Sequence, residues 1–204
     1  MRRTIPAQAF DAVVFDLDGT LVDSVRPDFL ACAALFEESG AAFVPEFWAR
    51  HVCGNAEGYA ALFEVLRERA GVGYTDAELH DRLRTQWERF FTPDHVVLMP
   101  GARALLDCLR ASGRPLAVAS SSERKWVERW LGHFGLTDHF AVVVSGDEVT
   151  RRKPDPMAYL RAAGLLGVPA RRCVAVEDSP TGTAAARAAG CTVVAVPNPL
   201  TRPL

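Results

Sequence analysis

Five short apolar runs, none of which alternates with polar residues, constrain the fold of this chain most strongly. A continuous run of four or five apolar residues is typical of a strand buried on both faces of a parallel sheet. The runs span residues 12–15, 116–119, 141–144, 173–176 and 192–196. Helical patterns at 126–131, 157–166 and 180–189 separate the last four, and a further one at 102–109 precedes the second run. Strands that alternate with helices form doubly wound sheets. The sequence therefore predicts an α/β fold with a mainly parallel, Rossmann-like sheet.

Residues from about 20 to about 92 interrupt this alternation. They show helical periods and no strand pattern, as in the apolar face of Phe29, Cys32, Ala33 and Phe36. A helical insert of this size after the first strand predicts a second domain. We expect a core domain of residues 1–19 and 93–204 and an all-helical domain of residues 20–92.

Charge and composition exclude several classes of protein. The 23 basic and 25 acidic residues give a net charge of −2. The sequence therefore lacks the excess positive charge typical of proteins that bind nucleic acid or an anionic membrane. The five cysteines form no CxxC pair, and we interpret them as reduced thiols. The longest uncharged stretch, residues 188–201, is too short to span a bilayer. These features predict a cytoplasmic protein without nucleic-acid or membrane partners. We also expect a monomer or weak homodimer.

Acidic, hydroxyl and lysine side chains follow the predicted strands. Ligands of open α/β sheets bind outside the carboxyl ends of the strands. Four carboxylates gathered there would repel one another unless a cation lay among them, and oxygen ligands suit Mg²⁺ that shares its site with a phosphate. The residues concerned are Asp16, Asp18, Ser120, Ser121, Lys153, Glu177 and Asp178.

Three predicted helices begin at the same edge, where their free N–H groups favour an anion. Asp155 with Pro156 and Ser179 with Pro180 read as N-cap and first helical residue. The third start is expected near Ser122, beside Ser120.

Four segments together resemble the motifs of the haloacid dehalogenase-like hydrolases. The helical insert resembles the cap of the β-phosphoglucomutase and sugar-phosphatase branch of that superfamily. The segments are FDLDGTLVDS (15–24), AVASSS (117–122), RKPDP (152–156) and VEDSPTGTAAARAAG (176–190). The resemblance implies a Rossmann-like core, a helical cap and a Mg²⁺-dependent phosphatase acting on a small phosphorylated metabolite such as a sugar phosphate.

The resemblance also implies roles for individual residues. Asp16 would be the nucleophile that forms an aspartyl phosphate, and Asp18 would be the general acid and base, positioned by Thr20. Lys153 would neutralise charge and, with Ser120 and Ser121, hold the phosphoryl oxygens. The implied metal ligands are Asp16, Asp18, Glu177 and Asp178. In the cap, Arg50, His51 and Asn55 are candidates for substrate contact.

Other functions remain open at this stage. A phosphomutase of the β-phosphoglucomutase type shares the scaffold, but that branch carries an arginine where this chain has Glu57, and an acid there repels a second phosphate. A receiver-like phospho-acceptor domain would place its acceptor after a later strand. A non-catalytic relative would carry a broken motif, and none of the four is broken.

Overall fold

The computed structural model describes residues 10–55, 57–198 and 200. They form two compact units, which are described separately below. Unit 1 comprises the described residues of 1–22 and 98–197, and unit 2 those of 23–97 and 198–204. The outer ends of the predicted core domain, residues 1–9 and 201–204, lie outside the described residues.

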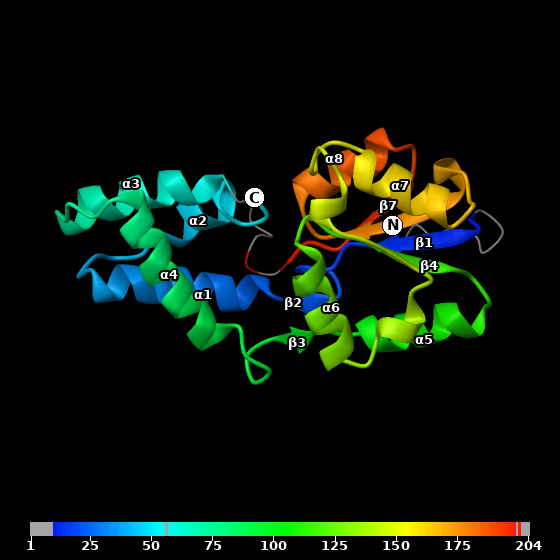
Figure 1. Ribbon diagram of the computed structural model, residues 1–204, viewed down its shortest axis with the longest axis horizontal. Coiled ribbons are helices and arrows are strands. Elements are labelled where there is room, and N and C mark those ends of the chain that lie inside the picture. Colours follow the sequence, from blue (N-terminus) through cyan, green and yellow to red (C-terminus); the bar gives the residue numbers. More distant parts are fainter. Residues whose placement is uncertain (1–9, 56, 199, 201–204) are drawn as a thin grey trace, which may run out of the picture. The chain divides into compact units, whose positions relative to one another are not determined.

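A sheet of five parallel strands forms the centre of unit 1, and it confirms the predicted α/β fold (Figure 1). The strand order is β5-β4-β1-β6-β7, so β1 lies in the middle. The five predicted runs all form strands, with ends that differ by at most one residue. The strands are β1 (Ala12–Phe15), β4 (Leu116–Ala119), β5 (Val142–Val144), β6 (Cys173–Glu177) and β7 (Thr192–Ala195).

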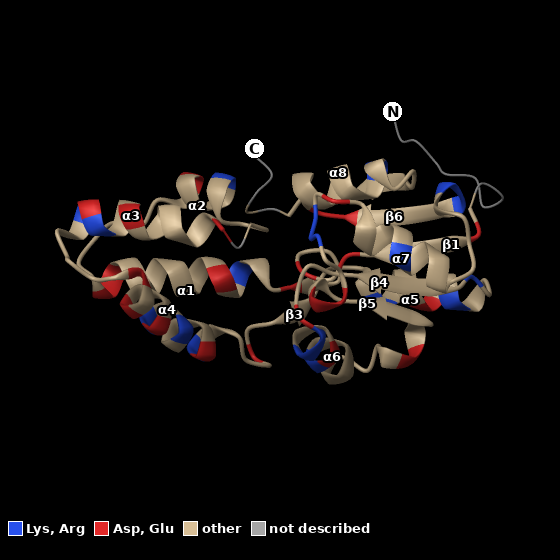
Figure 2. Ribbon diagram, turned by 45° about the horizontal axis from the view of Figure 1, so that its top comes forward, with Lys and Arg blue, Asp and Glu red and all other residues tan. Residues whose placement is uncertain are grey.

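Two helices cover each face of this sheet, with α5 and α6 on one side and α7 and α8 on the other (Figure 1). The helices are α5 (Ala102–Ala111), α6 (Arg124–His133), α7 (Met157–Leu165) and α8 (Pro180–Ala188). Three short 3₁₀ turns complete the connections, at Thr137–His139, Gly146–Glu148 and Ala170–Arg172. Charged residues lie mainly on the helices and loops, while the strands are nearly free of them (Figure 2).

The face of the sheet under α7 and α8 is built mainly from small residues. Side chains alternate between faces along a strand, so every second residue of β1, β4 and β6 points to this side. Ala12, Val14, Ala117, Ala119 and Ala175 pack in one buried cluster with alanines of α7 and α8. The parallel register places Ala12 beside Cys173 and Val14 beside Ala175. The next residues that point to this face are therefore Asp16, just after β1, and Glu177, at the end of β6.

Unit 2 is a four-helix unit with its own apolar core. Its helices are α1 (Val25–Glu38), α2 (Pro45–His51), α3 (Gly58–Ala70) and α4 (Asp76–Phe90). The predicted apolar face of α1 buries Cys32 and Phe36, and α3 and α4 contribute Phe63 and Leu83 to the same core. Helix α2 was not predicted because its seven residues hold too few apolar positions for a period, although Trp48 is fully buried.

One carboxylate of α1 contacts each of the other three helices of unit 2. Asp28 Oδ1 accepts hydrogen bonds from Tyr59 Oη of α3 at 2.9 Å and from Trp87 Nε1 of α4 at 2.7 Å. Its Oδ2 accepts one from Trp48 Nε1 of α2 at 3.0 Å. Burial raises the pKa of Asp28, although these three donors oppose the shift.

One short strand, β2 (Val22–Asp23), corrects the expectation that residues 20–92 hold no strand, and its partner β3 (Val97–Leu98) lies just after that range. Strands β2 and β3 form a two-residue ladder where the chain leaves unit 1 and returns to it. Two residues are too few to leave a pattern in the sequence. Among the described residues, no helix has the length and apolar character needed to cross a membrane.

Candidate active site

The centre of the site is an ion-paired lysine between two carboxylates. Asp16 follows β1 and Glu177 ends β6, on the face of the sheet that α7 covers. Lys153 Nζ, from the loop before α7, lies 2.6 Å from Asp16 Oδ1 and 2.6 Å from Glu177 Oε1. Its side chain is only 5% exposed. The structure thus brings together three residues that the sequence predicted for one edge of the sheet.

Glu177 is held on all sides by hydrogen bonds. Tyr159 Oη of α7 donates to Oε1 at 2.6 Å, and the Ser179 hydroxyl donates to Oε2 at 3.1 Å. A side chain at Gly182 would collide with this carboxylate, because a Cβ there would lie 1.8 Å from Oε1. Tyr159 was not predicted as a site residue, and its interior helical position gives no sign of it in the sequence.

Three carboxylates of the site meet the geometry of a cation site. Oxygens of Asp16, Glu177 and Asp178 lie within 4.8 Å of one another, whereas the side chain of Asp18 is not part of this group. Hard oxygen donors of this kind suit Mg²⁺. The arrangement of these residues therefore fits a divalent cation.

The pKa values of the site follow from burial and from the excess of negative charge. Burial raises the pKa of Asp16, and the neighbouring carboxylates add to the shift while Lys153 opposes it. Burial and the charge of Glu177 raise the pKa of Asp178 to about 7. Burial alone would lower the pKa of Lys153, but Asp16 and Glu177 outweigh it and raise that pKa. One lysine is too little positive charge for these carboxylates, and a bound cation would relieve the imbalance.

Asp18 is held by residues that follow β4. Ser122 Oγ donates to Asp18 Oδ2 at 2.6 Å, and Trp126 Nε1 of α6 donates to Oδ1 at 2.8 Å. Thr20, the expected partner, is buried, and its hydroxyl has no hydrogen-bond partner among the described residues. The sequence placed Trp126 in the helical pattern of residues 126–131 and not among the site residues. The available signal was the indole N–H itself, because a buried indole N–H usually has a hydrogen-bond acceptor.

The serine segment after β4 forms a turn before α6. Ser120 is buried, and its hydroxyl accepts a hydrogen bond from the Ser122 N–H at 3.0 Å. Ser121 is partly exposed, and a Cβ at Gly146 would lie 2.1 Å from its carbonyl oxygen. The helix predicted to begin near Ser122 is α6, which begins at Arg124 after the N-cap residue Glu123.

The starts of α7 and α8 were predicted more closely. Ser179 caps α8 through a hydrogen bond from the Gly182 N–H at 3.0 Å, with Pro180 as the first helical residue. Asp155 accepts a hydrogen bond from the Met157 N–H at 3.0 Å, but α7 begins at Met157, after Pro156. Both helices therefore begin next to the charged cluster.

The three predicted substrate contacts of unit 2 lie close together near the end of α2. Arg50, His51 and Asn55 are all exposed. Asn55 Nδ2 donates to the His51 carbonyl at 3.1 Å, and its Oδ1 accepts from the Glu57 N–H at 3.2 Å. Their role toward a substrate stays a prediction.

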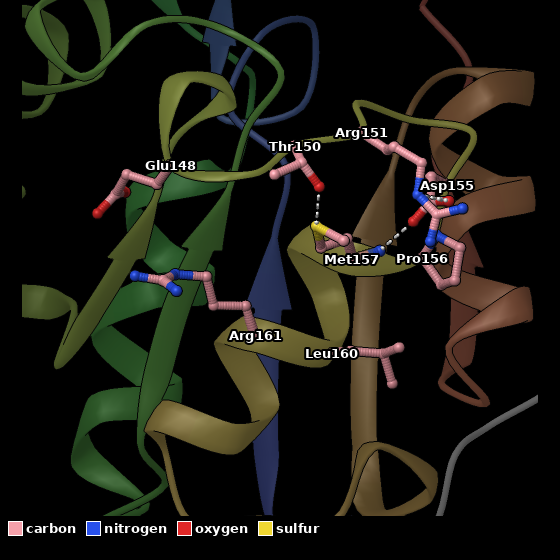
Figure 3. Close-up of a pocket in the computed structure, with 8 residues that line it drawn as sticks. All are labelled: Glu148, Thr150, Arg151, Asp155, Pro156, Met157, Leu160 and Arg161. Atoms are coloured by element: carbon pink, nitrogen blue, oxygen red, sulfur yellow. Dashed lines mark hydrogen bonds and ion pairs between the residues drawn. The ribbon is translucent and has the colours of Figure 1, made fainter.

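A surface pocket of about 400 Å³ lies on α7 and the loop before it (Figure 3). Arg151 and Asp155 form an ion pair of 3.0 Å at its rim. The pocket contains neither Asp16 nor Lys153, so it is not the chemical centre. Its lining residues are Glu148, Thr150, Arg151, Asp155, Pro156, Met157, Leu160 and Arg161.

Comparison with known proteins decides the family. The family model described as haloacid dehalogenase-like hydrolase matches residues 10–190. The chain belongs to this family. Phosphoglycolate phosphatase of Chromobacterium violaceum is 36% identical over 193 residues, which cover 91% of this chain and 84% of that protein. Hexitol phosphatase A of Escherichia coli is 34% identical over 190 residues, 93% of this chain and 84% of that protein.

A solved structure of this haloacid dehalogenase-like family supports the same conclusion. The hydrolase from Deinococcus radiodurans with bound phosphate and sodium matches with a TM-score of 0.76 and 34% identity, over 91% of this chain and 80% of that chain. The present chain is therefore an enzyme, a phosphoric monoester hydrolase. Enzymes of this family generally use Mg²⁺.

Proposed function

We propose that the protein hydrolyses a small phosphomonoester through an aspartyl phosphate on Asp16. The observation that carries this proposal is the bridge of Lys153 between Asp16 and Glu177, at 2.6 Å on each side. A carboxylate attacks a dianionic phosphate only where positive charge offsets the repulsion. The buried lysine supplies such charge directly beside Asp16.

The proposed reaction has two steps. Asp16 forms a bond to phosphorus while the bond from phosphorus to the ester oxygen breaks, and Asp18 gives its proton to that oxygen. Water then forms a bond to phosphorus while the bond from phosphorus to Asp16 breaks. Asp18 takes a proton from the attacking water, and inorganic phosphate leaves. Ser120 and Ser121 would bind phosphoryl oxygens beside Lys153.

The proposed Mg²⁺ ligands are the carboxylates of Asp16, Glu177 and Asp178 and the backbone carbonyl of Asp18. The cation supplies charge neutralisation for the phosphoryl group. Support comes from the three clustered carboxylates and from the raised pKa of Asp178. Glu177 also has a second task, because it fixes Lys153 from the side opposite Asp16.

The proposed substrate class is a small phosphorylated metabolite, with sugar and sugar-alcohol phosphates first among the candidates. Relatives named for phosphoglycolate and for hexitol phosphates support it. Hydrolysis is preferred to phosphoryl transfer between two sugar positions because the exposed Glu57 stands where a mutase carries an arginine.

Replacing Asp16 by asparagine tests the proposal. Asp16→Asn keeps the shape of the side chain but removes the nucleophile, so turnover of every phosphate ester should fall below a tenth of the normal kcat. The measurement is phosphate release from a panel of sugar, glycolytic and aryl phosphates in the presence of Mg²⁺. Asp138→Asn, an exposed substitution outside the site, is the control and should stay fully active. An Asp16→Asn variant with more than a tenth of the activity would exclude Asp16 as the nucleophile.

A further inference from the structure

We propose that Trp126 is a positioning residue for Asp18, and that its indole N–H and the Ser122 hydroxyl together orient the carboxyl group that protonates the leaving oxygen. This inference rests on the function proposed above. It adds two residues, neither of them in the expected catalytic set. It also replaces Thr20 as the residue that positions Asp18.

Two hydrogen bonds orient the carboxylate of Asp18. Trp126 Nε1 donates to Oδ1 at 2.8 Å and Ser122 Oγ donates to Oδ2 at 2.6 Å, so each carboxylate oxygen has its own donor. The terminal torsion of an aspartate is otherwise broad. Two donors on different oxygens fix both the position and the plane of the carboxyl group.

Packing alone does not account for the indole of Trp126. The next tryptophan on the same helix face, Trp130, is fully buried, and its Nε1 has no hydrogen-bond partner among the described residues. The two rings meet edge to face, with centroids 5.7 Å apart. Trp126 is only partly buried, and its N–H is the one that meets a carboxylate of the site.

The difference between the two donors determines which oxygen of Asp18 carries the transferable proton. An indole N–H is a donor only, whereas a serine hydroxyl both donates and accepts. When Asp18 is protonated, Oδ1 stays the acceptor of the Trp126 N–H, and the proton resides on Oδ2. The Ser122 hydroxyl then reverses to accept it, until the proton passes to the ester oxygen. Trp126 thus selects which oxygen of Asp18 acts as the acid.

The expected consequence appears only when the leaving group needs a proton. Misplacing a general acid slows departure of a basic leaving group but has little effect on a good one. The value of kcat/KM includes the steps up to this departure, and it excludes the later attack of water. A series of phenyl phosphates, from 4-nitrophenyl to 4-methylphenyl, varies leaving-group basicity at nearly constant size.

Trp126→Phe is the test variant, because it removes the N–H and keeps an aromatic ring against Trp130. We expect kcat/KM for 4-methylphenyl phosphate to fall about tenfold, the scale of one hydrogen bond to a charged group. For 4-nitrophenyl phosphate it should change less than twofold. Trp130→Phe is the matched control on the same helix and should leave the dependence on the leaving group unchanged. Thermal melting confirms that the variants fold, and Ser122→Ala, which removes the other donor, should act in the same direction.

Asp18→Asn separates failure of this inference from failure of the proposed function. If Asp18→Asn steepens the dependence on the leaving group while neither Trp126→Phe nor Ser122→Ala does, the positioning role is overturned and the reaction stands. If Asp18→Asn itself leaves the dependence unchanged, Asp18 is not the general acid and the proposed mechanism fails with it. Steeper dependence in all three variants supports the inference.

Discussion

At the scale of single residues, Gly182 decides whether Glu177 can occupy its place. We expect Gly182→Ala to push the Glu177 carboxylate away from Lys153 and Tyr159, because the new Cβ would lie 1.8 Å from Oε1. Activity should fall at least tenfold. Gly164→Ala is the control, a substitution in the neighbouring helix α7 with no atom within 4 Å of the new Cβ. It should keep full activity and gain about 0.5–1 kcal/mol in the free energy of unfolding. Equal kcat/KM for the two variants and the normal protein would contradict this role of Gly182.

The residues that could be predicted are those fixed by strand ends. Asp16, Ser120 and Glu177 each end or follow an uninterrupted apolar run, so their meeting at one edge follows from parallel pairing. Trp126 lies 108 residues from Asp18, and Tyr159 lies 18 residues from Glu177. The apolar periods of α6 and α7 indicate which face of each helix is buried, but they do not show which carboxylate a polar atom on that face meets.

At the scale of elements, Asp28 makes the four helices of unit 2 depend on one carboxylate. Asp28→Asn should lower the free energy of unfolding by about 2 kcal/mol, because an amide nitrogen cannot accept a hydrogen bond and one of the buried N–H donors around Asp28 would lose its partner. Urea unfolding followed by tryptophan fluorescence measures this loss. The control is Asp81→Asn on α4, where exposed Asp81 pairs with Arg84 at 3.0 Å. Exposed ion pairs contribute about 0–1 kcal/mol, so this variant should lose less than about 0.5 kcal/mol in the free energy of unfolding.

The same carboxylate predicts a dependence of stability on pH. The pKa of Asp28 in the folded chain is raised above its ordinary value of 3.8. The folded state therefore binds more protons than the unfolded state between pH 3.8 and the raised pKa, and the contribution of Asp28 to stability falls as pH rises through this window. The difference in unfolding free energy between the normal protein and Asp28→Asn should accordingly be larger at pH 4 than at pH 7. A difference that grows with pH would contradict the shift.

Element boundaries show why the fold was largely predictable and the inserted unit less so. Strands β1 and β4 coincide with their apolar runs because turns and helix starts bound them sharply. Helix α2 escaped prediction, since its single fully buried side chain is Trp48. Strands β2 and β3 have two residues each and are created by the crossing of the chain.

At the scale of the whole molecule, chemistry and substrate choice are expected to reside in different units. Asp16, Lys153 and Glu177 all belong to unit 1, whereas Arg50, His51 and Asn55 belong to unit 2. Substitutions at the latter three should change the ranking of phosphate esters by kcat/KM and leave 4-nitrophenyl phosphate nearly unchanged. The experiment is a matrix of alanine variants against the ester panel. If a unit 2 variant lowered kcat/KM by the same factor for every ester, unit 2 would not determine substrate choice.

The central position of β1 has a consequence for synthesis on the ribosome. β1 is made first among the strands of the sheet, but one of its neighbours, β6, ends at Glu177. Until Glu177 has been translated, the edge of β1 that later pairs with β6 has no partner strand. Unpaired apolar strand edges of this kind bind chaperones or aggregate. The enzyme also gains its charged centre only then, because Glu177 is the last of the bridge residues to be made. Catalytic activity is thus a late reporter of folding, and fragments that end before β6 should be inactive however well their earlier helices form.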